Sequence, residues 1–255
     1  MKIHFLGTGT SQGIPVIGSN HPVCLSDDPH DNRLRSSILI EWDHQHILVD
    51  CGPDFRQQML RIKNHKLDAI LFTHEHSDHT AGIDDIRPYC FYNEAPMPIF
   101  AQERVMNNLK KRFDYVFETQ NRYPGAPSVA PYVVTPYQEF LVGNKKVMPL
   151  LVQHGNLPIL GYRFDKFAYL TDVKTLSEQT YSMLKDLDVL VLSALHLNTH
   201  QTHSNLEEAL AHVNIIKPKQ TYFTHMGYQM GFHAEVDKSL PKNINLAYDK
   251  LIIEI

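Results

Sequence analysis

The segment Thr73-His74-Glu75-His76-Ser77-Asp78-His79-Thr80 follows directly on the apolar run Ala69-Ile70-Leu71-Phe72. It places three imidazoles and the carboxylate of Asp78 at the end of an expected buried strand, which would hold them on a rigid support. Imidazole and carboxylate together suit zinc, manganese or iron. The segment therefore predicts a metal site. A polar surface loop is the alternative. This alternative is disfavoured if residues able to bind a metal also follow later strands.

Other parts of the chain repeat this pattern, in which an apolar run ends in a residue able to bind a metal. The repeats are Leu48-Val49-Asp50, Leu150-Leu151-Val152-Gln153-His154, Ala168-Tyr169-Leu170-Thr171-Asp172 and Tyr222-Phe223-Thr224-His225. Site residues gather at strand ends because the scaffold positions them there. The recurrence favours one shared metal centre over unrelated surface loops.

Composition limits the class of protein. The chain has 255 residues, 43% of them hydrophobic, which suits one large domain or two small ones. A net charge of −4 argues against a general nucleic-acid binder, which carries a basic excess. Three cysteines without a disulfide framework indicate a reducing, cytoplasmic location. We expect neither a signal peptide nor a membrane span, since no apolar run approaches the roughly 20 residues required.

The hydrophobic patterns predict strands and helices in alternating blocks. Expected strands cover residues 38–42, 46–50, 67–72, 146–152, 161–164, 167–170, 189–192, 221–223 and 251–253, and expected helices cover 53–62, 103–118, 176–187 and 206–216. Two β-rich halves that each carry helices suggest two sheets packed face to face with helices outside. We therefore predict an α+β fold, a four-layer αββα sandwich of two mixed sheets, formed as a single domain by residues 1–255.

Taken in order, the motifs resemble the metallo-β-lactamase fold superfamily, whose pattern is His-x-His-x-Asp-His followed by a distant His, Asp and His. The resemblance covers nearly the whole chain, from the first strand to His225. It implies two divalent metal ions, with zinc expected and manganese or iron as alternatives. The implied ligands are His74, His76 and His154 for the first metal, Asp78, His79 and His225 for the second, and Asp172 as the bridge.

The resemblance also implies roles for individual carboxylates. Asp50 would orient a ligand loop or a ligand histidine rather than bind metal, with a simple turn residue as the alternative. Asp172 stands where members that open β-lactams commonly carry cysteine, which points to phosphodiesterase, ribonuclease or thioester-hydrolase branches. His76 stands where diiron relatives have an acidic residue, which favours hydrolysis over redox chemistry.

The opening stretch Phe5-Leu6-Gly7-Thr8-Gly9-Thr10-Ser11-Gln12-Gly13-Ile14-Pro15, with Arg33-Leu34-Arg35, is similar to the phosphoribosyl cyclic phosphodiesterase, or PhnP-like, branch. The opening could be a glycine turn or a phosphate contact. That branch often holds a structural zinc on cysteines and a histidine. The corresponding positions here are Ser19, His21, Cys24 and Tyr228, so we predict no structural zinc.

A second histidine cluster lies in Leu195-His196-Leu197-Asn198-Thr199-His200-Gln201-Thr202-His203. By the resemblance, His203 is a non-ligand histidine that donates a proton to the leaving oxygen or stabilises phosphoryl charge, and Asp78 helps to orient the nucleophile. His196 and His200 remain open between functional and surface roles. We expect five further histidines, His4, His44, His46, His65 and His212, at the surface.

The predicted function is a metal-dependent phosphodiesterase for a small cyclic or nucleotide-like substrate of the phosphoribosyl cyclic phosphate type. A tRNA 3′-processing nuclease or a thioester hydrolase of the same fold are alternatives, and a non-catalytic carrier is an alternative of another class. Lys110-Lys111-Arg112 fits a solvated helix face better than an RNA contact. We expect the chain to bind a small molecule and neither nucleic acid nor a membrane. A homodimer is the expected oligomeric state by default. Residues 86–130 are candidates for covering the site.

Overall fold

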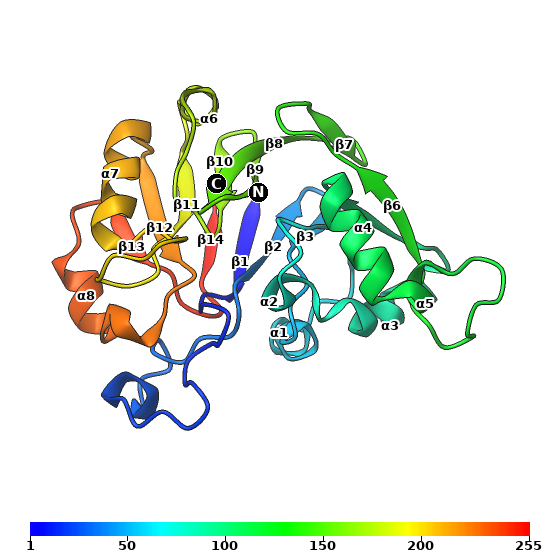
Figure 1. Cartoon of the computed structure of the whole chain (residues 1–255), viewed down its shortest axis with the longest axis horizontal. Helices are drawn as coiled ribbons and strands as arrows, with labels where there is room; N and C mark the ends of the chain where they lie inside the picture. Colours follow the sequence, from blue (N-terminus) through cyan, green and yellow to red (C-terminus); the bar gives the residue numbers. More distant parts are fainter.

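Two seven-stranded sheets lie face to face in the computed structural model, which describes residues 1–255 (Figure 1). Helices cover the outer face of each sheet, with α1 to α5 on one side and α7 and α8 on the other (Figure 1). The predicted α+β sandwich with four αββα layers is confirmed. The two chain ends lie side by side at one end of the sheets, where the Met1 amino group donates to the Ile255 carbonyl at 2.8 Å.

The first sheet has the order β14-β1-β2-β3-β4-β5-β6. Its strands are antiparallel from β14 to β3 and parallel from β3 to β6. Their bounds are Ile252–Glu254 for β14, Lys2–Gly7 for β1, Ser37–Trp42 for β2, Gln45–Val49 for β3, Ala69–Leu71 for β4, Met97–Ala101 for β5 and Val129–Val133 for β6.

The second sheet has the order β13-β12-β11-β10-β9-β8-β7 and repeats this division. Strands β7 to β10 are antiparallel, and β10 to β13 are parallel. Their bounds are Phe140–Val142 for β7, Lys145–His154 for β8, Leu157–Phe164 for β9, Phe167–Leu170 for β10, Val189–Ser193 for β11, Gln220–Thr224 for β12 and Ile244–Leu246 for β13. Each sheet therefore has a parallel half, and parallel strands bring their carboxyl ends to one edge.

The helices connect the strands within each half. Their bounds are Phe55–Ile62 for α1, Ser77–Thr80 for α2, Arg87–Asn93 for α3, Glu103–Arg112 for α4, Asp114–Phe117 for α5, Glu178–Met183 for α6, Leu206–Ile216 for α7 and His233–Ser239 for α8, with 3₁₀ turns at Pro22–Leu25, Ile83–Ile86 and Tyr228–Met230. None of these helices combines the length and hydropathy that crossing a bilayer would require.

Side-chain alternation along the strands divides the core into layers. In β2, Ile38 and Ile40 belong to the apolar cluster between the sheets, whereas Leu39 belongs to the cluster beneath the helices of the first sheet. Successive residues of a strand point to opposite faces, so both faces of β2 are buried. This explains why the central strands appear in the sequence as continuous apolar runs rather than as alternating ones.

Several predicted elements differ from the observed ones. The helix expected over 103–118 is divided into α4 and α5, because Phe113 leaves the helical conformation at φ −129°. Strands β5 and β6 were not predicted, and they contain Pro98 and Pro131, which weaken a strand signal. The expectation that His4 and His212 are surface residues is wrong, since both are buried.

The start of α7 offers a direct test of the fold. Asn205 caps this helix by accepting a hydrogen bond from Glu208 N at 2.9 Å, and the Glu208 carboxylate accepts one from Asn205 N at 3.0 Å. We expect Asn205→Ala to lower the free energy of unfolding by about 1 kcal/mol, because a helical N–H loses its partner. Urea denaturation measures this. The exposed Asn214→Ala on the same helix is the control, and equal unfolding midpoints for the two variants would contradict the capping role.

Candidate metal centre

The predicted ligands come from both sheets and meet at the carboxyl ends of their strands. In the first sheet, Asp50 follows β3 and His74 lies shortly after β4. In the second sheet, His154 ends β8, Asp172 follows β10 and His225 follows β12. The structure thus brings together residues that are distant along the chain.

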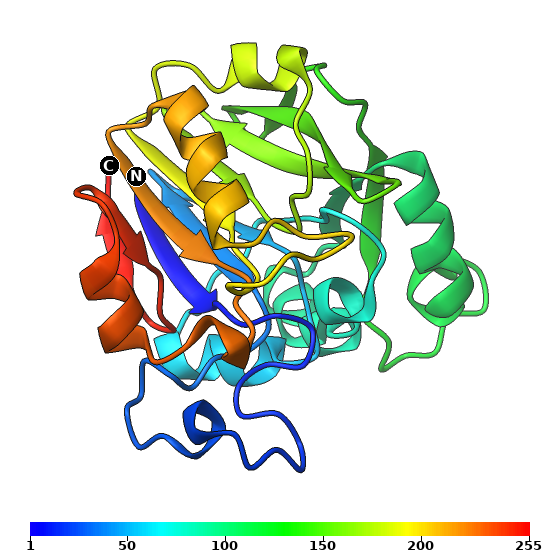
Figure 2. The ribbon, with the colours of Figure 1, turned by 60° about the vertical axis from the view of Figure 1, so that its left-hand side comes forward.

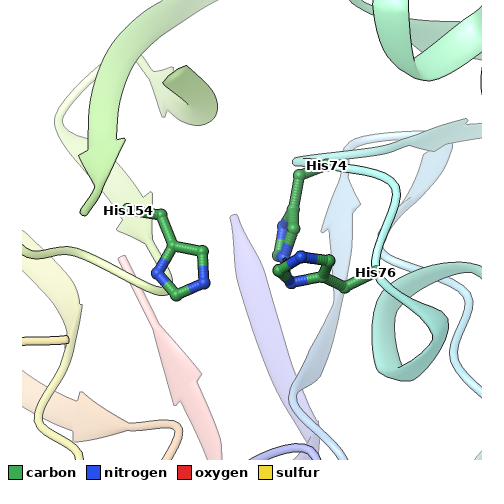
Figure 3. A group of neighbouring side chains, drawn as sticks. All are labelled: His74, His76 and His154. Carbon is green, nitrogen blue, oxygen red and sulfur yellow. Dashed lines mark hydrogen bonds between the residues drawn. The ribbon is translucent and has the colours of Figure 1, made fainter. Parts of the chain in front are cut away.

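The first group consists of His74, His76 and His154, whose ligand atoms all lie within 4.8 Å of one another. Figure 3 shows the His154 ring, at the end of β8, facing the His74 and His76 rings across the space between the two sheets. His74 Nε2 and His76 Nδ1 are 2.9 Å apart. His76 is exposed, so the group is open to solvent on that side.

The second group consists of Asp78, His79 and His225, also within 4.8 Å. His79 Nε2 is 3.1 Å from Asp78 Oδ2. Asp172 lies between the two groups: its Oδ2 is 3.3 Å from His79 Nε2 and its Oδ1 is 3.1 Å from His225 Nε2. The same carboxylate is also within ligand range of His74 and His79 together. This position fits a carboxylate shared by two cations.

Hydrogen bonds to the outer ring nitrogens fix the orientation of the histidines. His154 Nδ1 lies 2.8 Å from the Thr202 carbonyl, which can only accept, so Nδ1 carries the proton. His79 Nδ1 lies 2.7 Å from Asp50 Oδ2 and donates in the same way. In a neutral ring with a protonated Nδ1, the lone pair belongs to Nε2. The Nε2 lone pairs of both rings therefore face the cluster.

Threonine hydroxyls play the same part for two further rings. Thr73 Oγ1 donates to Asp50 Oδ2 at 2.8 Å, so it accepts from His74 Nδ1 at 3.0 Å. Thr171 Oγ1 donates to Asp172 Oδ2 at 2.7 Å, so it accepts from His225 Nδ1 at 3.4 Å. Such outer partners are typical of metal-binding histidines, because they select the tautomer that offers Nε2 to the metal.

The cluster of lone pairs and carboxylates requires positive charge at its centre. Burial disfavours the charged form of His79, but the carboxylates of Asp78, Asp50 and Asp172 outweigh it and raise the pKa of His79 well above its usual value. A proton there is poorly placed, since the buried His79 Nε2 has no hydrogen-bond partner of good geometry. Burial also holds the pKa of His74 well below its usual value, so that ring is neutral. Divalent cations fit these residues better than protons do.

Asp50 organises the first ligand loop. It is fully buried and accepts hydrogen bonds from Thr73 N, Thr73 Oγ1 and His79 Nδ1 at 2.7–2.8 Å. Gly52 allows the loop to come this close, because a Cβ at this position would lie 2.0 Å from the Asp78 carbonyl oxygen. Removing such an outer partner costs about 10- to 100-fold in metal affinity or activity in other metal sites.

Three residues of the site have left-handed backbone conformations, Asp50 at φ +65°, Asp172 at +55° and His225 at +58°. This conformation costs L-residues roughly 1–2 kcal/mol each, although aspartate and histidine are among those that adopt it most readily. Asp50 and His225 follow directly on β3 and β12, and Asp172 is the second residue after β10. The turn ends the strand and directs the side chain towards the neighbouring sheet.

A basic contact with the ligand loop was missed by the sequence analysis. Arg112, at the end of α4, donates to the Glu75 carbonyl at 2.8 Å, Thr80 Oγ1 at 3.0 Å and Ser77 Oγ at 3.2 Å. Arg104, earlier in α4, pairs with the Glu75 carboxylate and donates to a carbonyl of β9. Lys110, Lys111 and Arg112 are all exposed, as expected for a solvated helix face, but Arg112 also holds the ligand loop. The run of three basic residues in the sequence did not predict this contact.

His203 belongs to neither of these two groups, but its ligand atom lies within 4.8 Å of those of His154 and Asp172. Its ring centroid is 4.4 Å from that of His154 and 5.3 Å from that of His225, and its Nδ1 is 3.7 Å from Asp172 Oδ1. Burial lowers the pKa of His203 to about 3, although the Asp172 carboxylate acts in the opposite direction. The ring is therefore neutral at pH 7 and offers an N–H hydrogen bond rather than a readily transferred proton.

The opening glycine loop packs beside the site. Gly9 N donates to Leu34 O and Thr10 N donates to Met226 O, so these amides are not free to bind phosphate. The Thr10 hydroxyl, in contrast, lies 3.3 Å from His225 Nε2. Of the two interpretations left open by the sequence, the observed contacts favour a structural glycine turn.

The residues at the structural-zinc positions of related proteins form an apolar contact here. The His21 and Tyr228 rings pack with centroids 4.7 Å apart, and Cys24 is buried in a small cluster with Ile14 and Val23. Tyr228 packs against the same cluster. His21 Nδ1 accepts a hydrogen bond from Val23 N, so this ring nitrogen is already engaged. Side-chain packing thus connects these segments, and the absence of a structural zinc stays a prediction.

Known proteins share this architecture. The sequence profile of the family described as "Beta-lactamase superfamily domain" matches residues 45–226, and that fold implies divalent metal ions. A solved structure described as a new diphosphatase from the PhnP family is 39% identical, with a TM-score of 0.92, over 99% of this chain and 96% of that one.

Curated relatives match over part of their length. A protein of Porphyromonas gingivalis named octanoyltransferase is 38% identical over 253 residues, which are 98% of this chain and 51% of that protein. A ribonuclease Z of Methanocaldococcus jannaschii is 27% identical over 178 residues, which are 64% of this chain and 47% of that protein. The chain thus spans about half the length of these curated relatives. Together with the profile match and the solved structure, these likenesses show that the chain belongs to the beta-lactamase superfamily, in its PhnP family.

Proposed function

We propose that this chain is a dinuclear metal-dependent hydrolase that cleaves a phosphodiester or diphosphate linkage in a small substrate. The observation that carries the proposal is the arrangement of two ligand groups around the shared Asp172 carboxylate. His74, His76 and His154 would hold one cation, and Asp78, His79 and His225 the other. Histidine and aspartate ligands suit zinc, with manganese or iron as alternatives.

Cations at these positions would lower the pKa of a water molecule towards neutrality and offset negative charge on the phosphoryl oxygens. The protein's own side chains have separate tasks. Asp78, whose side chain is 11% exposed, reaches the solvent side of the second group and would orient the attacking water. Asp50 and the two threonine hydroxyls hold the histidine rings in place. Preorganised ligands of this kind need no rearrangement during the reaction.

His203 would act on the departing side of the substrate. Because its ring is neutral at pH 7, its N–H would donate a hydrogen bond to a phosphoryl or leaving-group oxygen. A nearby cation would lower its pKa further, which strengthens this role relative to full proton transfer. The leaving oxygen would then take its proton from solvent once the bond has broken.

The substrate class rests on chemistry shared across the PhnP family. Cyclic phosphodiesters and diphosphates both present an anionic phosphorus with an oxygen leaving group, and the same centre suits both. The ribonuclease Z likeness keeps a nuclease as a second candidate. The name octanoyltransferase describes a protein about twice as long, and it keeps a thioester among the substrates to test.

One screen separates these candidates. Metal-loaded protein is assayed on bis(p-nitrophenyl) phosphate, a ribose cyclic phosphate, a nucleoside diphosphate sugar, a tRNA precursor and an acyl thioester, with metal content measured on the same sample. We expect turnover of the small phosphorus substrates. Cleavage of only the tRNA precursor or only the thioester would overturn the proposal, and inactivity on all five would support a non-catalytic carrier.

The first prediction concerns metal removal. Cations that bind only the folded state stabilise it by about 4 kcal/mol when their concentration is 1,000 times Kd. We therefore expect a chelator to lower Tm by several degrees and two added equivalents of zinc or manganese to restore it. His74→Ala should reduce the metal content and remove much of this shift, whereas the exposed His65→Ala should not. A chelator-insensitive Tm, with no metal bound, would refute the dinuclear centre.

The second prediction concerns His203. We expect His203→Ala to lower kcat on the order of 100-fold with unchanged metal content, and His203→Gln to recover part of the loss, because an amide also donates a hydrogen bond. With a pKa of about 3, the ring stays neutral between pH 5 and 8, so the variant should not remove a limb of the pH profile in that range. Loss of a metal equivalent in His203→Ala would instead make His203 a ligand.

The third prediction concerns Arg112. We expect Arg112→Ala to weaken metal binding and lower kcat by about 10-fold, because the loop that carries His76 and Asp78 loses three hydrogen bonds. Arg112→Lys should recover only part of the metal affinity and of kcat, since an ammonium cannot reproduce the planar guanidinium. The adjacent exposed Lys111→Ala is the control. Metal titration and steady-state kinetics measure both effects, and identical behaviour of the two alanine variants would disprove the role of Arg112.

A further inference from the structure

The loop between β11 and α7 begins and ends beside the metal centre. Leu195 N donates to Ser204 O, and Leu206 N donates to His196 O, both at 2.9 Å, so the base of the loop is closed by backbone hydrogen bonds. Figure 2 shows this loop, drawn in yellow to gold, extending outward from the start of α7. Its tip, residues 197–201, is exposed. A closed base with an exposed tip holds side chains in place while leaving them accessible.

Three histidines of this loop continue outward from the metal centre. The His203 ring is 4.4 Å from the His154 ring, the His200 ring is 5.1 Å from the His203 ring, and the His196 ring is 5.8 Å from the His200 ring. The imidazoles thus form a row that begins at the first ligand group, reaches the surface at His200 and continues to the half-buried His196. The proposed function uses only His203.

The outer rings have unused hydrogen-bonding capacity. Thr202 N donates to His200 Nδ1 at 3.3 Å, so the proton of the neutral His200 ring is on Nε2. His200 is exposed, and this N–H is directed to no protein acceptor that the structure records. His196 Nδ1 is buried without a partner. The free His200 N–H, next to the unpartnered His196 Nδ1, suits an oxygen-rich ligand.

The loop itself adds no negative charge to this row. The loop from 195 to 205 contains no aspartate or glutamate. Burial, followed by the neighbouring His196, His154 and Lys174, lowers the pKa of His200, so this ring is neutral at pH 7 and offers an N–H hydrogen bond rather than a positive charge. Lys174 forms an ion pair with Glu208, which offsets part of its charge, but the histidines have no such acidic partner in the loop.

We propose that His200 and His196 form a subsite for the second phosphoryl group of a diphosphate substrate, whose reacting phosphoryl group lies at the metal centre beside His203. This inference deepens the proposed function and rests on it. A cyclic phosphodiester has a single phosphorus and would leave the subsite empty. The histidine row would therefore make the chain prefer diphosphates over monophosphorus diesters.

A binding experiment tests the subsite without turnover. The probes are a nucleoside diphosphate sugar with a methylene group in place of the bridging oxygen, which cannot be hydrolysed there, and the corresponding nucleoside monophosphate. Calorimetry on metal-loaded protein should show that His200→Ala lowers the affinity for the diphosphate analogue by about tenfold, which corresponds to the loss of one hydrogen bond to a charged group. The affinity for the monophosphate should stay within about twofold of the parent value. The double variant with His196→Ala and His200→Ala should bind the analogue more weakly still.

Kinetics provides the second arm, with Asn198→Ala, in the exposed tip of the same loop, as the matched control. For a nucleoside diphosphate sugar, KM should rise in His200→Ala while kcat changes little. For bis(p-nitrophenyl) phosphate, both constants should stay near the parent values. Equal changes in KM for both substrates, or no change for either, would overturn the assignment of this subsite. Parent protein that binds the methylene analogue through His200 but hydrolyses neither substrate would support the subsite and overturn the proposed function.

Discussion

The buried carboxylate of Asp50 is the interaction on which the metal centre depends. Through Thr73 Oγ1 it fixes the tautomer of His74, and directly through His79 Nδ1 it fixes that of His79. One side chain thereby presents a lone pair to each of the two ligand groups. Since Asp50 has no exposure to water, its charge is compensated only by these hydrogen bonds and by the positive charge that the centre takes up. Burial raises its pKa, and the hydrogen bonds from His79 and Thr73 oppose this effect.

The position of Asp50 follows from the sheet topology. Strands β3 and β4 are parallel neighbours, so Asp50 and Thr73 lie at the same edge. The second sheet meets this edge directly, because Tyr162 on β9 donates its hydroxyl proton to the Phe72 carbonyl at 2.7 Å and Leu160 N donates to the Thr73 carbonyl at 3.0 Å. The two sheets are thus joined by hydrogen bonds at the point where their ligands converge. Packing between the sheets and assembly of the centre are consequently coupled.

The sequence predicted the layers and the ligand candidates because both leave local signals. An apolar run followed by histidine or aspartate is visible in a few residues, and β10 and α7 begin and end where the pattern placed them. Arg112 left no such signal, because its partners are backbone and hydroxyl groups more than 30 residues away. The neutral state of His203 was equally hidden, since it results from burial by segments that only the fold brings together. Contacts across the structure, rather than motifs, determine these properties.

Two supports outside the ligand set hold the metal centre from opposite sides. The ligand loop is held from one side by Arg112 and Arg104 on α4, and His154 is held from the other side by the β11–α7 loop through the Thr202 carbonyl. Both supports lie outside the ligand set, so either can change its exposed face without moving a ligand. The loop that fixes His154 also carries His200. If His200 binds substrate as proposed, the tip of this loop would set substrate preference while its base holds His154 in place.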